Sequence, residues 1–226
     1  YFAQYEFKVK YLLSASDCES LPMGELLDMA SPESLELWQS LKLGYTESAG
    51  HPLLLAEIAR LYHDIQPENI ITAAPEEAIF IAMHTLLAPG DEVVAVSPAY
   101  QSLHEIARAT GCRLIPWQFR PGADGWQLDL NDLQRSLTPR TRLLIVNFPH
   151  NPTGATLEPA DLEQLAERLR GSGIFVLADE VYEHIMYDGR WHESVLRHPE
   201  LAARAFIVSS FGKTYHCTGW RMGYCI

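Results

Sequence analysis

Apolar runs without polar alternation constrain the fold of this 226-residue chain more than any other feature. Three such runs cover residues 143–148, 174–178 and 206–209, with Asn147 as the one polar residue inside the first and Ser209 at the end of the third. Strands of this kind are buried on both faces, as in a parallel sheet that helices cover on both sides. The sequence therefore predicts a three-layer α/β/α fold with a mainly parallel sheet.

Further segments fit the same alternation of strands and helices. Pro75 suits the first turn of a helix, and glycines at 111 and 171 are typical of helix ends. We expect strands at residues 69–73, 92–96 and 113–116, and helices at 25–30, 33–41, from 51 onward, and at 75–87, 98–110, 130–137 and 158–170.

The charge of the chain excludes some classes of partner. Its 17 Lys and Arg residues against 29 Asp and Glu residues give a net charge of −12, and basic residues form no run. Nucleic acids and anionic membranes both require a basic surface, so neither is an expected partner. No apolar stretch approaches the roughly 18 residues that span a bilayer. The four cysteines fit no disulfide or zinc spacing, and we expect reduced thiols in a cytoplasmic protein without a metal site.

Polar residues gather where the predicted parallel strands end, which is the edge at which such sheets bind ligands. Asn151 follows the first apolar run, Asp179 and Tyr182 follow the second, and Ser210 and Lys213 follow the third. A lysine there can form a Schiff base with a carbonyl, and an aspartate can face a protonated ring nitrogen. Taken singly, these residues are better explained as a loop lysine, a structural carboxylate and an Asn-Pro turn.

Longer segments resemble the signature blocks of class I and II aminotransferases, a fold-type I family that uses pyridoxal 5'-phosphate (PLP). These blocks read VNFPHNPTGATL, ADEVYEHIMYDG and SSFGKTYHCTGWRMGY. Two earlier segments, YTESAGHPLLLAEIARLY and ITAAPEEAIFIAMHTLLAPGDEVVAVSPAYQS, are similar to earlier blocks of the family. All five stand in the family's order and cover residues 44–226.

The resemblance implies a role for each matching residue. Lys213 would bind PLP as a Schiff base and then move the proton of the substrate α-carbon, and Asp179 would keep the ring nitrogen protonated. Tyr182 and Asn151 would hydrogen-bond the phenolic oxygen of the ring, and Tyr100 would stack on its face. The phosphate contacts would come from Ser210, Arg221, the helix start at Pro75 and Glu76, and Tyr45, which would reach the phosphate of a neighbouring subunit.

One part of the match departs from the family. Its members usually carry glycine where Ala74 stands, and a residue with a backbone N–H where Pro75 stands. Because proline has no N–H, Glu76 and Glu77 would have to supply the backbone donors, with their side chains turned away from the phosphate. His216 and Cys217 follow the lysine without a third metal ligand, so we expect no metal there.

The resemblance also predicts how the protein is organised. Residues 1–44 would form an N-terminal arm or part of a small domain, and residues 45–226 the PLP-binding large domain. The small domain of the family would continue beyond Ile226, so we expect a piece of a longer protein. The active site would be shared across a homodimer.

The implied activity is that of an aminotransferase, which moves an amino group between an amino acid and a 2-oxo acid. A β-lyase, such as a carbon–sulfur lyase, or a decarboxylase would share the same blocks. An aminotransferase-like, ligand-sensing domain of a transcription regulator is an alternative of another class. A product that forms only when a 2-oxo acid is present would distinguish the first of these enzymes from the others.

Overall fold

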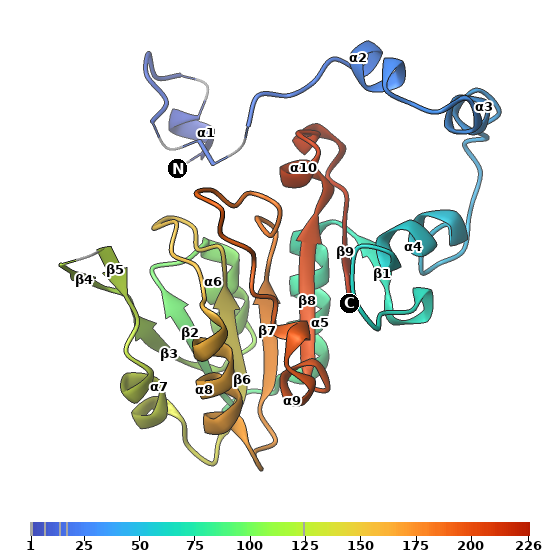
Figure 1. Cartoon of the computed structure of the whole chain (residues 1–226). Helices are drawn as coiled ribbons and strands as arrows, with labels where there is room; N and C mark the ends of the chain where they lie inside the picture. The colour runs from blue at the N-terminus through green and yellow to red at the C-terminus, as the bar shows by residue number, and fades with distance from the viewer. Residues whose placement is uncertain (1, 7, 14, 17, 124) are drawn as a thin grey trace.

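The computed structural model describes residues 2–6, 8–13, 15–16, 18–123 and 125–226, and its centre is a large β-sheet (Figure 1). Within these residues the sheet has seven strands in the order β1-β9-β8-β7-β6-β2-β3. All neighbouring pairs from β8 to β3 are parallel, whereas β9 is antiparallel to both β8 and β1. The mainly parallel sheet predicted from the sequence is confirmed. The strands are β1 (Ile71–Ala73), β2 (Glu92–Ser97), β3 (Arg113–Gln118), β6 (Thr141–Asn147), β7 (Phe175–Asp179), β8 (Ala205–Ser210) and β9 (Gly223–Cys225).

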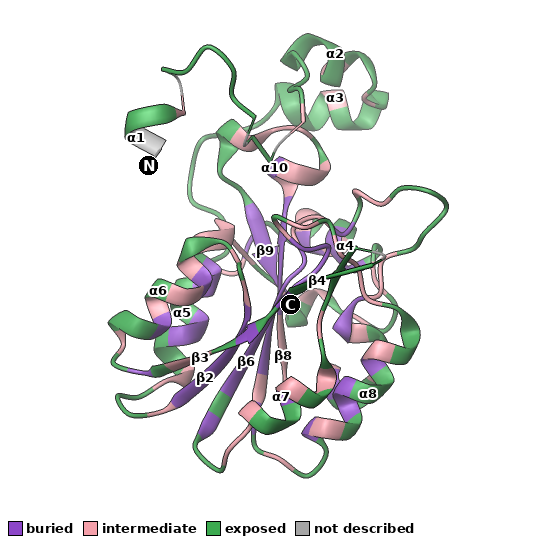
Figure 2. Ribbon diagram, turned by 90° about the vertical axis from the view of Figure 1, so that its left-hand side faces the viewer, coloured by how far each residue is buried: buried purple, intermediate pink, exposed green. Residues whose placement is uncertain are grey.

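Helices cover both faces of this sheet, as Figure 2 shows from the side. α5 and α6 lie on one face, and α7 and α8 lie on the other. The helices are α1 (Phe2–Tyr5), α2 (Met23–Asp28), α3 (Pro32–Gln39), α4 (Pro52–Ala59), α5 (Pro75–Leu86), α6 (Gln101–Ala109), α7 (Leu130–Ser136), α8 (Pro159–Leu169), α9 (Pro199–Ala202) and α10 (Phe211–Thr214), with 3₁₀ turns η1 (Pro67–Asn69), η2 (Val195–Arg197) and η3 (Thr218–Trp220).

Alternate residues of the central strands supply two separate apolar cores. In β6, Leu143 and Ile145 pack toward α5 and α6, whereas Leu144 and Val146 pack toward α7 and α8. Both faces of the strand are therefore buried against apolar side chains. This explains why the run lacks polar alternation, since a polar side chain on either face would lose its contact with water.

Leu144 provides a test of this packing. It is fully buried in the middle of β6, so Leu144→Ala leaves a cavity between the sheet and α8. We expect a loss of about 2–5 kcal/mol in the free energy of unfolding, measured by urea denaturation. Leu53, which is 55% exposed on α4, supplies the control, because Leu53→Ala removes the same atoms from a largely solvated position. Equal midpoints for the two variants would contradict the buried position of Leu144.

The helix predicted at residues 98–110 begins later than expected, at Gln101. A ring nitrogen of His104 hydrogen-bonds the carbonyl oxygen of Val96, and a ring nitrogen of His150 hydrogen-bonds the carbonyl oxygen of Pro98. The carbonyl of Tyr100 accepts a hydrogen bond from the Leu103 N–H at the start of the helix, while the backbone of Tyr100 itself is extended (φ −59°, ψ 139°). Residues 98–100 therefore form a loop after β2, which carries Tyr100 to the end of the sheet.

A small hairpin and the N-terminal segment are the parts of the fold that the sequence pattern does not indicate well. β4 (Arg120–Gly122) pairs with β5 (Gly125–Gln127), and both strands are exposed, so neither has an apolar pattern. The described residues before Gly50 include none that is buried. Figure 1 shows this segment passing above the sheet and then descending to α4. The domain boundary at residue 45 remains a prediction.

Two simpler expectations can be compared with the structure directly. The four cysteines, Cys18, Cys112, Cys217 and Cys225, are free. Among the described residues, the helices are too short or too polar to cross a membrane.

Candidate active site

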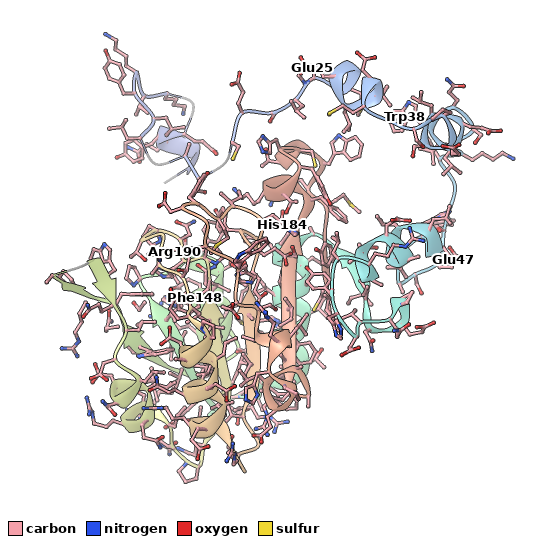
Figure 3. The ribbon with its side chains drawn as sticks, in the orientation of Figure 1. Glu25, Trp38, Glu47, Phe148, His184 and Arg190 are labelled. Carbon is pink, nitrogen blue, oxygen red and sulfur yellow. The ribbon has the colours of Figure 1, made fainter. Side chains whose placement is uncertain are left out.

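A cavity of about 550 Å³ opens at the carboxyl ends of the parallel strands. Of the ten residues that the sequence singles out, nine line it: Pro75, Glu76, Tyr100, Asn151, Asp179, Tyr182, Ser210, Lys213 and Arg221. Tyr45 does not line the cavity, and its side chain is fully exposed. Figure 3 shows His184 and Arg190, from the segment after β7, at the same end of the sheet, below the N-terminal segment that carries Glu25 and Trp38.

The register of β6 and β7 places Asn147 beside Asp179 at the floor of the cavity. The Asn147 side-chain amide donates to the Asp179 carbonyl at 3.0 Å, and its oxygen accepts from the Asn151 N–H at 3.1 Å. Asn147 thus fixes the backbone of two predicted site residues. In the sequence Asn147 stands out only as a polar residue within an apolar run, and that exception is the signal that points to it.

Asp179 is a buried carboxylate, and its burial determines its charge. Burial, supported by the negative charges of Glu76 and Glu180, raises the pKa of Asp179 to about 7. The Val181 N–H, which donates to its Oδ1 at 3.3 Å, and the positive charge of Lys213 oppose this shift only in part. The position therefore favours a cationic ligand group that can accompany the ionised carboxylate.

Asn151, Tyr182 and Lys213 lie on one side of the cavity. The Asn151 amide lies 3.5 Å from the Tyr182 hydroxyl, and Lys213 Nζ lies 5.5 Å from the centre of the Tyr182 ring. Lys213 Nζ also donates to the carbonyl of Ser16 at 3.2 Å. The amine, the hydroxyl and the amide therefore face a common space, and the N-terminal segment closes it from above.

The other end of the cavity collects groups that suit an anion. Gly223 lets β9 approach closely, because a Cβ there would lie 2.3 Å from the Ser209 carbonyl and 2.8 Å from Pro75. This approach brings Ser210, Arg221 and the start of α5 to one place. Arg221 has a left-handed backbone (φ 53°, ψ 38°), a conformation that costs a non-glycine residue about 1–3 kcal/mol and is concentrated at functional sites.

The side chain of Glu76 differs from the expectation that it turns away from this end of the cavity. Glu76 lines the cavity, and its negative charge contributes to the raised pKa of both Tyr100 and Asp179, where burial is the larger cause. Glu77 is exposed and does not line the cavity. The helical periodicity explains this, since neighbouring residues on a helix point about 100° apart.

His150 connects two loops of the site and was not singled out from the sequence. It is 3% exposed and lies against Phe119, with ring centres 4.1 Å apart. Its ring nitrogens lie 2.7 Å from the Pro98 carbonyl and 2.7 Å from the Thr153 hydroxyl. Burial lowers the pKa of His150 to about 4, so the ring is neutral at physiological pH. It therefore joins the loop of Tyr100 to that of Asn151 without adding charge.

Three potential metal ligands, Glu180, Glu183 and His192, lie within 4.8 Å of one another behind the cavity. Their hydrogen bonds are already used within the protein. His192 Nε2 lies 2.7 Å from Glu180 Oε2, and the Val195 N–H donates to Glu180 Oε1 at 3.0 Å. Glu183 accepts from hydroxyl groups of other segments. The arrangement is explained by hydrogen bonding alone.

The donor set of the cavity fits PLP. Lys213 offers an amine for the aldehyde, and Asp179 offers a carboxylate for the ring nitrogen. Asn151 and Tyr182 offer donors for the phenolic oxygen, and Tyr100 offers a ring of similar size. The opposite end offers the Ser210 hydroxyl, the Arg221 guanidinium and the positive end of α5 for the phosphate.

Known proteins resemble this chain in sequence and in structure. The family described as aminotransferase class I and II matches residues 19–226. The methionine aminotransferase of Escherichia coli K12 is 40% identical over 163 residues, which cover 72% of this chain and 42% of that protein. The aspartate aminotransferase of Sulfolobus acidocaldarius is 33% identical over 189 residues, which cover 80% of this chain and 47% of that protein.

A solved structure agrees with these sequence matches. A PLP-dependent aminotransferase from Streptococcus suis aligns with a TM-score of 0.87 and 29% identity, covering 99% of this chain and 59% of its own chain. The chain thus spans about half the length of the proteins it matches.

Proposed function

The chain belongs to the class I and II aminotransferase family, and on this basis we propose that the protein binds PLP and transfers an amino group from an amino acid to a 2-oxo acid. The observation that carries the proposal is the meeting of Asp179, Lys213 and Arg221 in one cavity, each beside the part of PLP that it would bind. The relatives named as aminotransferases favour transfer over elimination or decarboxylation.

Each residue of the cavity would have its own role toward the cofactor. When bound, PLP supplies an electron sink for negative charge at the substrate α-carbon. Lys213 would hold the aldehyde carbon through Nζ and, once displaced by substrate, carry the proton to and from the α-carbon. Asp179 would keep the ring nitrogen protonated. Tyr182 and Asn151 would orient the ring through its phenolic oxygen, and Tyr100 would cover its face.

Glu76 places a negative charge at the phosphate end of this site, and its replacement is a direct test of that end. Its negative charge opposes that of the phosphate, so Glu76→Gln should strengthen PLP binding by about three- to tenfold. The affinity of the cofactor-free protein would be measured by equilibrium dialysis. Glu77→Gln is the matched control, because Glu77 is exposed one position further along α5. An unchanged affinity for Glu76→Gln would show that its carboxylate does not oppose the phosphate, and a weaker affinity would show that it assists binding.

The exposed N-terminal segment supports the proposal of a homodimer. Large apolar side chains along it are open to solvent, including Leu13 at 95%, Leu43 at 99% and Tyr45 at full exposure. Apolar surface of this kind is usually covered by a partner. In the proposed assembly a second copy covers the segment, and Tyr45 reaches the phosphate bound by that copy. We also propose that residues 1–44 form an N-terminal arm or part of the small domain, and that the protein is cytoplasmic.

The activity would be tested with a panel of amino donors, beginning with methionine and aspartate, the amino acids named for the two relatives above. Each donor is mixed with the protein, PLP and a 2-oxo acid, and the new amino acid and new 2-oxo acid are quantified. An aminotransferase yields both in equal amounts and only when the 2-oxo acid is present. Release of ammonia or carbon dioxide without a 2-oxo acid would instead identify a lyase or a decarboxylase.

A further inference from the structure

We propose that Glu183 is a positioning residue that holds Tyr182 and Ser210 in register, one at the ring end of the cofactor site and the other at the phosphate end. The proposal rests on the function proposed above, because both residues are assigned to PLP there. Its basis is a buried hydrogen-bond cluster directly behind the cavity.

One carboxylate oxygen is the centre of this cluster. Glu183 is 7% exposed, and its Oε1 accepts from Tyr62 Oη at 2.6 Å and from Ser209 Oγ. Tyr224 Oη lies 3.3 Å from the same oxygen and 2.7 Å from Tyr62 Oη. Burial, together with the charge of Glu183, raises the pKa of both tyrosines, so they remain protonated donors.

The members of the cluster are sequence neighbours of residues that line the cavity. Glu183 directly follows Tyr182, and Ser209 directly precedes Ser210. The bond between Glu183 and Ser209 therefore ties the backbone under Tyr182 to the backbone under Ser210. A shift of either segment must break this bond or move the other segment with it.

The two tyrosines extend the connection to further parts of the site. Tyr224 pairs with Ser209 in the β8–β9 ladder, and Arg221 lies three residues before it. Tyr62 follows α4 and anchors the cluster to the helix at the end of the N-terminal segment. The cluster thus joins four parts of the sequence, and those of Glu183, Ser209 and Tyr224 each lie within three residues of a residue that lines the cavity.

The segment that carries Tyr182 depends on such an anchor. Residues after β7 form turns, with the Glu183 N–H bonded to the Glu180 carbonyl at 2.9 Å and the Ile185 N–H bonded to the Tyr182 carbonyl at 2.8 Å. Neither bond joins the segment to the sheet. The Glu180 N–H does bond to the Val208 carbonyl of β8 at 2.9 Å, so after Tyr182 the Glu183 side chain is what bonds the segment to β8. A carboxylate that accepts several hydroxyl groups in a buried environment supplies a strong and directional attachment.

The other buried acid on this segment does not provide the same link. Glu180 bonds to His192 and to the Val195 N–H, and neither of these residues lines the cavity. Of these two carboxylates, only that of Glu183 bonds to strands that form the cofactor site. This difference assigns the positioning role to Glu183.

The test measures two properties of Glu183→Gln besides activity. The first is the dissociation constant of PLP for the cofactor-free protein, and the second is the pH midpoint of the visible absorbance of bound PLP. We expect binding to weaken about tenfold. We expect the midpoint to rise by about half a pH unit or more, because a displaced Tyr182 hydroxyl donates less well to the phenolic oxygen.

A second background separates positioning from general damage. In Tyr182→Phe the hydroxyl is already absent, so adding Glu183→Gln should leave the pH midpoint unchanged. Glu92→Gln is the control for stability. Glu92 is a fully buried carboxylate at the first residue of β2, the end of the strand that lies away from the cavity, and it pairs there with Arg113 and Arg140. Glu92→Gln should lower the melting temperature without changing the dissociation constant of PLP or the pH midpoint of its absorbance.

The possible outcomes separate this inference from the proposed function. If the unaltered protein binds no PLP, the proposed function fails and the inference fails with it. If it binds PLP and Glu183→Gln behaves like Glu92→Gln, or if the midpoint shift persists in the Tyr182→Phe background, the inference alone is wrong. Should Glu183→Gln not fold, Ser209→Ala is used in its place, because it removes one donor to the same oxygen. The PLP dissociation constant and the pH midpoint should then change in the same directions but by less.

Discussion

Lys213→Ala should lower the rate of amino transfer by at least about 10⁴-fold, because it removes both the covalent attachment of PLP and the proton carrier at Nζ. PLP should still bind, since Asp179, Ser210 and Arg221 are untouched. A spectroscopic titration would follow this binding, and steady-state assays would follow the rate.

The control for this variant is another lysine of the same chain. Lys42 is exposed and does not line the cavity, so Lys42→Ala should retain the full rate. Borohydride reduction adds a chemical readout: the peptide that contains Lys213 should carry the pyridoxyl group in the unaltered protein and lose it in Lys213→Ala. Near-normal turnover of Lys213→Ala would remove the basis for assigning the lysine a catalytic role.

Asp179→Asn should lower the rate by about 10²–10⁴-fold, the equivalent of losing an ion pair of about 3–5 kcal/mol with the ring nitrogen. The same change should stabilise the cofactor-free protein above neutral pH. Burial raises the pKa of Asp179 from its ordinary value of 3.8 to about 7, so the folded chain holds a proton that the unfolded chain releases.

The sign of this stability effect follows from proton binding. As the pH rises from about 4 to about 7, the unfolded chain gains the ionised carboxylate while the folded chain keeps it protonated, so the folded state loses relative stability. Asparagine has no proton to release. The cofactor-free variant should therefore be more stable than the unaltered protein at about pH 8, by on the order of 2–4 kcal/mol, and no more stable near pH 4. A variant that is less stable at both pH values would contradict the burial of an unpaired charge at this position.

The parts of the fold that follow from local pattern were predictable. The apolar runs of β6, β7 and β8 predict the sheet. The edge at which the cavity lies is indicated by the residues that follow these runs: Asn151, Asp179, Ser210 and Lys213. Strand ends could be inferred because a buried strand must remain apolar until it leaves the core.

Other features depend on contacts between distant segments and leave little trace in sequence. The start of α6 is set by histidine rings that take two carbonyl groups, and one of these rings comes from residue 150. Gly223 matters because β9 approaches the Ser209 carbonyl, and no local pattern encodes that approach. Glu183 reads as a surface acid in ADEVYEHIMYDG until the fold brings Tyr62, Ser209 and Tyr224 around it.

A single spectroscopic cycle tests the central proposal most directly. The purified protein is mixed with PLP, then with a mixture of L-amino acids, and after removal of the excess with a 2-oxo acid, and the visible spectrum is recorded at each stage. The proposed function predicts a visible band that disappears with the amino acids and returns with the 2-oxo acid. A band that amino acids leave unchanged, or that no 2-oxo acid restores, would contradict amino transfer by this site.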